Sequence, residues 1–176
     1  LNVYNWDTYI GENTISNFTK QTGIKVKYDL FANNEEMFAK LKEGNPGFDV
    51  IFPSDYMVET MTTLDMLVPL NHQKIPNIKN IDPDPNFSNP AYSPGLKHAI
   101  PYMWGTVGIG YRKSKVKSKP TSWKILLDSD EFKGRIALLA DQRTVIGITL
   151  KYLGYKLNST NPDEIAEIKK IADDHV

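Results

Sequence analysis

The spacing of hydrophobic residues in the first part of the chain alternates between the periods of strands and helices. Apolar and aromatic residues recur at every second position over 24–31, which predicts a strand. Ile15 and Phe18 share one face of a helix expected over 14–22, and Gly23 is expected to end it. Further strands are expected over 1–6, 48–52 and 67–70, and further helices over 33–44 and 58–66. This β-α-β-α-β-α order predicts an α/β domain with a parallel sheet, in which the apolar run 48–52 is a buried strand.

The chain from residue 71 onward has a different pattern. Residues 71–94 are rich in proline and asparagine, which predicts a loop. Later strands are expected over 100–112, which glycines interrupt, and over 135–140, and later helices over 122–127, 144–153 and from 161 onward. These later elements are too few to build a second sheet, so we expect the chain to be part of a larger protein.

Two helix starts carry recognisable capping signals. Asn33 and Glu36 have the spacing of a capping box, in which each side chain binds a backbone N–H of the first turn. Asn161 is followed by Pro162, and proline is well suited to the first position of a helix. Both starts are predicted from local sequence alone.

The composition of the chain excludes several classes of function. Lys+Arg and Asp+Glu both number 21, and this balance disfavours nucleic-acid binding, which needs a basic surface. No window reaches the ~20 apolar residues of a membrane span, and the absence of a signal peptide suggests a cytosolic or already mature chain. The chain has no cysteine, which excludes disulfides and thiolate chemistry, and its three histidines lack metal-ligand spacing. We expect no cofactor, no metal and no membrane insertion.

The candidate chemistry lies where predicted strands end. Three such ends are the segments 4–9, 53–56 and 140–141; each carries a carboxylate, and the first two also carry aromatic rings. Carboxylates bind cationic groups, and ring faces attract cations and cover methylene groups. Ligands of open α/β sheets bind at the carboxyl ends of the strands. The residues therefore indicate a binder of a small cation.

Several segments also resemble a known family, collinearly over essentially the whole chain. The chain is similar to the first half of spermidine/putrescine-binding periplasmic proteins, the substrate-binding subunits of ABC importers. The matching segments are Tyr4-Asn5-Trp6, 18–26, Asn34-Glu35, Phe48-Asp49-Val50, Pro53-Ser54, 100–105, Thr121-Ser122-Trp123 and 152–155. The resemblance implies the type II periplasmic binding protein fold, with two lobes built on central, mostly parallel sheets. Residues 1–110 would form the N-terminal lobe and 111–176 an incomplete C-terminal lobe.

The resemblance also implies a set of ligand contacts. Trp6 matches a tryptophan that lies along the polyamine, and Asp141 matches a carboxylate of the second lobe. The candidate ligand-binding residues are Trp6, Asp7, Thr8, Tyr9, Ser54, Asp55, Tyr56, Trp104 and Asp141. The implied partners are a polyamine and the permease subunits of an ABC importer, and the implied location is periplasmic or lipid-anchored outside the cytoplasm.

Two departures from the family pattern leave the ligand open. Relatives have a carboxylate at the position of Thr8, whereas here the carboxylate is at Asp7. Spermidine binders tend to have a glutamate three residues after Asp141, whereas here the residue is Thr144. The lost negative charge slightly favours putrescine over the triamine spermidine.

Structural roles are the alternatives for several of these residues. Trp6 could belong to the core, Ser54 could cap the following helix, and Asp141 could cap the helix that begins near Thr144. A second class of function is a sensor or interaction lobe that has the same fold and no transport role. Nothing in the sequence places an acid–base pair around a substrate bond, so we do not expect an enzyme.

Overall fold

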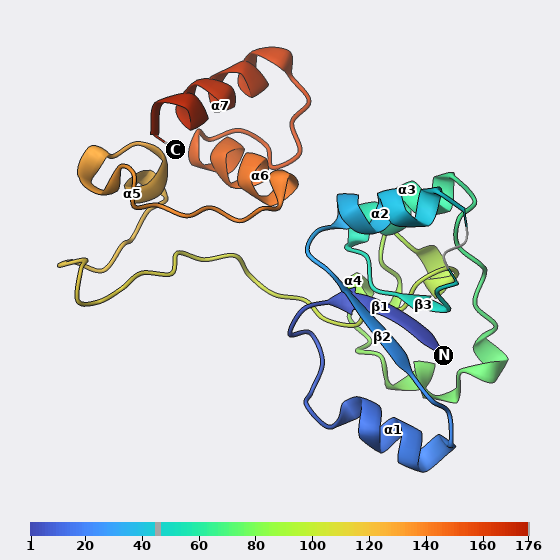
Figure 1. Ribbon diagram of the computed structural model, residues 1–176. Coiled ribbons are helices and arrows are strands. Elements are labelled where there is room, and N and C mark those ends of the chain that lie inside the picture. The colour runs from blue at the N-terminus through green and yellow to red at the C-terminus, as the bar shows by residue number, and fades with distance from the viewer. Residues whose placement is uncertain (45–46, 176) are drawn as a thin grey trace. The chain divides into compact units, whose positions relative to one another are not determined.

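The computed structural model describes residues 1–44 and 47–175 (Figure 1). It consists of two compact units, Leu1–Gly105 and the chain from Thr106 onward.

A three-stranded parallel sheet forms the centre of the first unit. The strands are β1 (Asn2–Trp6), β2 (Lys27–Phe31) and β3 (Val50–Ile51), in the order β2-β1-β3. The central strand is the most buried, since Val3, Tyr4 and Asn5 are all buried. Because all three strands are parallel, their carboxyl ends lie along the same edge, which Trp6 reaches opposite Phe31.

Three helices accompany the sheet, α1 (Thr14–Thr22), α2 (Asn34–Lys42) and α3 (Asp55–Thr63). Figure 1 shows α2 and α3 together on one side of the sheet and α1 on the other. Helix α1 ends as predicted at Gly23, which has a φ of 72° and donates its N–H to the Thr19 carbonyl. The predicted cap of α2 is also confirmed, because Asn33 Oδ1 accepts the Glu36 N–H at 2.8 Å.

The core of the first unit lies between the sheet and α2 and α3. It contains Tyr4, Phe31, Met37, Met57 and Met61, all nearly inaccessible to solvent. The Tyr4 ring meets that of Phe31 edge-on, with centroids 5.0 Å apart. Three methionines fill the remaining space, as expected of a flexible side chain that adapts to irregular gaps.

The proline-rich region 71–94 is a series of short helical turns rather than an open loop. They are η1 (His72–Lys74), η2 (Pro76–Asn80), α4 (Pro85–Ser88) and η3 (Pro94–Leu96). The buried Ser93 hydroxyl accepts the N–H groups of His98 and Ala99, both at 3.1 Å. This bond pair holds the chain that leads into residues 100–105.

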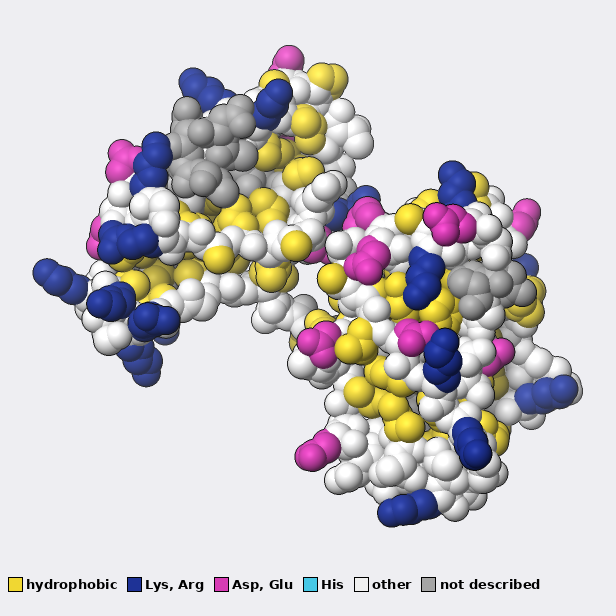
Figure 2. Space-filling view, in the orientation of Figure 1, with side chains coloured by type: hydrophobic (Ala, Val, Ile, Leu, Met, Phe, Trp, Pro, Cys, Tyr) yellow, Lys and Arg dark blue, Asp and Glu magenta, His cyan; other side chains and the backbone are white. Residues whose placement is uncertain are grey.

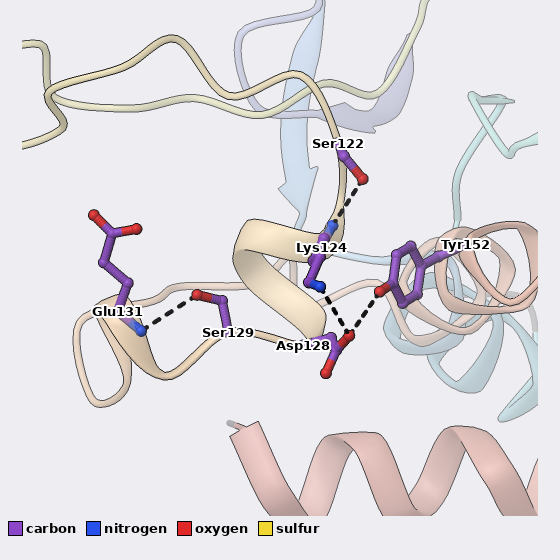
Figure 3. A network of polar contacts seen from close by, with 6 residues as sticks. All are labelled: Ser122, Lys124, Asp128, Ser129, Glu131 and Tyr152. Atoms are coloured by element: carbon purple, nitrogen blue, oxygen red, sulfur yellow. Dashed lines mark hydrogen bonds and ion pairs between the residues drawn. The ribbon is translucent and has the colours of Figure 1, made fainter.

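The second unit is built from α5 (Lys124–Leu127), η4 (Asp130–Phe132), α6 (Gln142–Tyr152) and α7 (Pro162–His175). The Asn161 start of α7 is confirmed, since its Oδ1 accepts the Asp163 N–H at 3.0 Å. Figure 3 shows how α5 is joined to α6: the Tyr152 hydroxyl donates to Asp128 Oδ2 at 3.0 Å. A Cβ at Gly147 would lie only 3.0 Å from Leu157 Cδ1, so glycine permits this close packing.

The structure contradicts several of the expected strands. Segments 67–70, 100–112 and 135–140 are irregular, and no strand occurs among the residues described from Thr106 onward. The described part of the second lobe therefore contains no sheet, in agreement with the expectation that these elements are too few to build one. The third strand is only two residues long, and its Val50 is 40% exposed rather than buried. Apolar runs form strands only where neighbouring strands complete their hydrogen bonds.

Candidate functional site

The indole of Trp6 is fixed at the carboxyl edge of the sheet. Its Nε1 donates a hydrogen bond to the Phe52 carbonyl at 2.7 Å, which ties the end of β1 to the residue after β3. The Trp6 ring lies 4.6 Å from that of Phe31 between centroids. The side chain is only partly buried, so it packs on the core and still reaches solvent. Trp6 therefore has a core role where its ring packs against Phe31, and its remaining surface is open to solvent.

A buried asparagine sets the direction of the chain at Trp6. Asn5 is inaccessible to solvent; its Oδ1 accepts the Trp6 N–H at 2.8 Å, and its Nδ2 donates to the Tyr28 hydroxyl at 2.7 Å. Burial raises the pKa of Tyr28, although the bond from Asn5 acts in the opposite direction. Both polar groups of this asparagine are thus used within the fold.

The three residues after Trp6 form an exposed turn. Asp7, Thr8 and Tyr9 are all exposed, and Thr8 has a φ of 63°, a left-handed conformation unusual for a β-branched residue. The Tyr9 ring lies 6.2 Å from that of Trp6, and the Tyr9 carbonyl accepts a bond from the Tyr102 hydroxyl. The Asp7 carboxylate therefore lies next in sequence to a cluster of rings.

We call this cluster the aromatic edge, which consists of Trp6, Tyr9, Phe31, Phe52 and Tyr102. Tyr102 closes it from a distant part of the chain, because its ring meets Phe52 at 4.6 Å in an edge-on arrangement. Aromatic faces of this kind attract cations and cover methylene groups.

The second loop of the site is held by Asn34, at the start of α2. This residue is 0% exposed; its Oδ1 accepts the Ser54 N–H at 2.9 Å, and its Nδ2 donates to Ser54 Oγ at 3.0 Å. Ser54 is at the N-cap position of α3 but makes no side-chain capping bond. The alternative that its hydroxyl caps the helix is therefore wrong, and the hydroxyl binds Asn34 instead.

Asp55 and Tyr56 follow in the first turn of α3. The exposed Asp55 accepts the Tyr56 N–H on its own Oδ1 at 2.8 Å. Burial raises the pKa of Tyr92, and the negative charge of Asp55 adds to this effect. The Tyr56 hydroxyl donates to Glu35 Oε1 at 3.1 Å. Like Trp6, Tyr56 is partly buried against the core of Tyr4 and its neighbours. This loop thus adds a second set of carboxylates and a phenol.

Two candidates remain, Trp104 and Asp141. Trp104 is 77% exposed, and its ring lies 6.3 Å from that of Phe87. Asp141 belongs to the second unit and is the N-cap of α6, where its Oδ1 accepts the Thr144 N–H at 2.7 Å. The structural role weighed for Asp141 is thus present, and its approach to the first unit stays a prediction.

Four residues of the site region are absent from the candidate set. They are Asn34, Glu35, Phe52 and Tyr102. Asn34, Glu35 and Tyr102 lie within segments that match the family, which is the signal that could have identified them. Their contacts join residues 20 to 93 positions apart, and hydrophobic spacing carries no information on such pairs.

Exposed carboxylates beside ring faces can bind a protonated amine attached to an apolar chain. Within the residues that the structure describes, no cluster of three or more His, Cys, Asp and Glu side chains could hold a metal ion. The helices of the described chain include none that is long and apolar enough to cross a membrane.

Comparison with known proteins identifies relatives over most of the chain. The family model of bacterial extracellular solute-binding proteins matches residues 13–175. The putrescine-binding periplasmic protein SpuD of Pseudomonas aeruginosa is 36% identical over 97% of this chain and 49% of its own length. The spermidine/putrescine-binding periplasmic protein of Escherichia coli is 39% identical over 97% of this chain and 50% of its own length.

Solved structures give the same result for the fold. A putative spermidine/putrescine ABC transporter protein from Listeria monocytogenes superposes with a TM-score of 0.89 at 40% identity, over 97% of this chain and 52% of that one. The Tp0655 (TpPotD) lipoprotein of Treponema pallidum gives 0.88 at 34% identity, over 99% and 54%. The chain spans about half the length of the relatives it matches.

Proposed function

The chain belongs to the family of bacterial extracellular solute-binding proteins, and on that premise we propose that the complete protein captures a polyamine and delivers it to an ABC importer. The α/β fold with a parallel sheet is that of the periplasmic binding proteins it resembles. Relatives at 36% and 39% identity carry names that specify putrescine or spermidine and putrescine. The proposed ligand is therefore putrescine or spermidine.

The observation that carries this proposal is the pairing of Trp6 with Asp7. The bond from Trp6 Nε1 to the Phe52 carbonyl holds the indole still, and the exposed Asp7 carboxylate follows it directly. A polyamine has protonated nitrogens joined by methylene groups, so it matches a ring face followed by a carboxylate. An immobilised ring also loses little conformational freedom when the ligand binds.

The expected energies are sufficient for tight binding. Each charge-assisted hydrogen bond contributes roughly 1.5–3 kcal/mol and each cation–π contact roughly 0.5–2 kcal/mol. A few of these contacts reach micromolar affinity, about −8 kcal/mol, after the costs of association are subtracted.

The remaining contacts are proposed from both units. The ligand-contacting set is Trp6, Asp7, Thr8, Tyr9, Ser54, Asp55, Tyr56, Trp104 and Asp141. Glu35 joins this proposal because its carboxylate accepts the Tyr56 hydroxyl and so lies near the second loop. Asp141 would supply a carboxylate from the second lobe when the two lobes close on the ligand.

The proposal includes location and partners. We infer a periplasmic or lipid-anchored protein outside the cytoplasm that docks onto the permease subunits of an importer. In transport, the protein would bind the polyamine and release it to the permease, and no residue is assigned a covalent step.

Isothermal titration calorimetry on the complete protein tests this function. Putrescine and spermidine are titrated separately, and a neutral sugar is the control ligand. We expect saturable binding of at least one amine and no heat from the sugar. If neither amine binds, transport of polyamines is ruled out and a sensor or interaction role is favoured.

A further inference from the structure

The balanced net charge of the chain conceals an uneven distribution. No Asp or Glu occurs between Asp84 and Asp128. Within that stretch, residues 112–119 form what we call the basic segment. Its five cationic residues are Arg112, Lys113, Lys115, Lys117 and Lys119. This local excess is large for a chain whose total charge is zero.

All five cationic side chains of the basic segment are exposed. The Arg112 carbonyl accepts the N–H groups of Lys115 at 2.9 Å and Val116 at 3.1 Å, so the segment begins with a turn. Figure 2 shows Lys and Arg side chains gathered at the lower left of the second unit, where Figure 1 draws the chain that leads into α5.

The segment and its neighbours in sequence supply no carboxylate. Neither of the ion pairs Lys27–Asp29 and Lys124–Asp128 involves the basic segment. Five exposed cations without a carboxylate among them repel one another, and an external polyanion relieves that repulsion.

We propose that the basic segment binds the anionic phospholipid surface of the membrane. The cations are mainly lysines, which act as hydrated point charges and suit a diffuse electrostatic contact, whereas bidentate recognition of a single carboxylate or phosphate favours arginine. The segment contains no aromatic residue, and its one aliphatic side chain, Val116, is partly covered, so the contact is electrostatic and does not insert. The diffuse negative potential of an anionic lipid surface fits such a contact better than a shaped acidic protein surface does.

This surface goes beyond the proposed polyamine function and does not depend on it. The basic segment shares no residue with the ligand-contacting set. Vesicle binding is measured without polyamine, so it can fail while calorimetry with putrescine succeeds, and the reverse also holds.

The test is sedimentation of the complete protein with lipid vesicles. One set contains phosphatidylglycerol and phosphatidylcholine, and the other contains phosphatidylcholine alone. The test variant replaces Lys113, Lys115, Lys117 and Lys119 with Gln. The control variant makes the same change in net charge in the first unit, at Lys20, Lys25, Lys74 and Lys79, which are all exposed.

We expect the wild-type protein and the control variant to bind the anionic vesicles. The test variant should bind them at least about tenfold more weakly, because each cation near an anionic surface raises the affinity about fivefold. Binding should also fall as salt rises from about 0.1 M to 1 M, since the screening length shortens from about 10 Å to about 3 Å.

Equal loss in both variants would show that net charge alone matters and would overturn the proposal. So would equal binding of wild type to the two kinds of vesicle. If the test variant binds vesicles normally but no longer associates with purified permease, the partner is an acidic protein surface and the lipid assignment is wrong.

Discussion

Trp6 and Asp7 are neighbours in sequence, yet their surroundings differ. The indole is held by Phe31 and by the Phe52 carbonyl, whereas the carboxylate of Asp7 is exposed. A substitution at Trp6 therefore changes both packing and ligand contact, and a substitution at Asp7 changes mainly charge. This difference makes Asp7 the sharper probe of the proposed ligand.

Asp7→Asn removes one negative charge with little change in shape. We expect it to weaken putrescine binding at low salt by roughly 1–3 kcal/mol, the contribution of one charged hydrogen bond. Calorimetry on the complete protein measures the effect. The matched control is Asp65→Asn, because Asp65 is exposed with a φ of 54°, which asparagine tolerates. Unchanged, tight binding of both amines by Asp7→Asn would remove Asp7 from the site.

Substitutions at Trp6 separate the ring from its hydrogen bond. Trp6→Phe keeps an aromatic face but loses the bond to the Phe52 carbonyl, and Trp6→Ala loses both. We expect both variants to unfold at lower temperature and Trp6→Ala to bind putrescine more weakly than Trp6→Phe. Calorimetry and thermal unfolding measure the two effects. Equal affinity of the alanine variant and the wild-type protein would show that the ring does not contact ligand.

Sequence reasoning proposed candidate site residues that adjoin strand ends and omitted those that hold these candidates in place. Trp6 and Ser54 follow apolar runs, so their place at the carboxyl edge could be predicted from the pattern. Asn34 and Tyr102 contact the site from 20 and 93 positions away, and only the folded chain brings them there. Local pattern thus predicts which residues can face a ligand, but not what holds them in position.

At the scale of elements, helices were predicted better than strands for a physical reason. A helix satisfies its backbone hydrogen bonds within itself, and its start depends on local caps such as Asn33 and Asn161. A strand needs neighbours, and the apolar segments 100–112 and 135–140 pair with none in this part of the chain. The prediction that these two segments are strands was therefore wrong, although both segments contain the apolar residues on which it was based.

Asp141 allows a capping role to be separated from a ligand role. Asp141→Ala removes the bond to the Thr144 N–H and should lower the free energy of unfolding by about 0.5–2 kcal/mol. Asp141→Asn keeps a capping oxygen and should leave stability nearly unchanged. If the carboxylate also pairs with an amine, both variants bind polyamine more weakly in calorimetry. Normal binding by the asparagine variant would limit Asp141 to capping.

At the scale of the whole molecule, total charge was a poor guide to surface charge. Equal numbers of acidic and basic residues argued against nucleic-acid binding, yet the basic segment lies in a long stretch without carboxylates. The two compact units also differ in their contribution: the first contains the sheet and the aromatic edge, and the second contributes Asp141. In the proposed function, selection between ligands depends on charges from Asp7 in the first unit and Asp141 in the second.

Thr144 is the residue of the second unit at which the choice between polyamines can be tested. Spermidine has one more charged nitrogen than putrescine, so it gains more from an added carboxylate. We expect Thr144→Glu to shift the ratio of affinities toward spermidine by roughly 1–2 kcal/mol, about five- to thirtyfold. Titration of both amines into the complete protein measures this ratio, and wild type should slightly prefer putrescine.

The Thr144→Glu variant should fold normally because the third position of α6 suits glutamate. Asp141 is the N-cap of that helix, and a glutamate at this position completes a capping box next to the positive end of the helix dipole. Gln142→Glu is the control, since it adds the same charge at the first helical position, about 200° away around the helix. A similar shift in both variants would mean that general negative charge, not a position beside the third amine, sets the preference. No shift in either would remove this end of α6 from the ligand site.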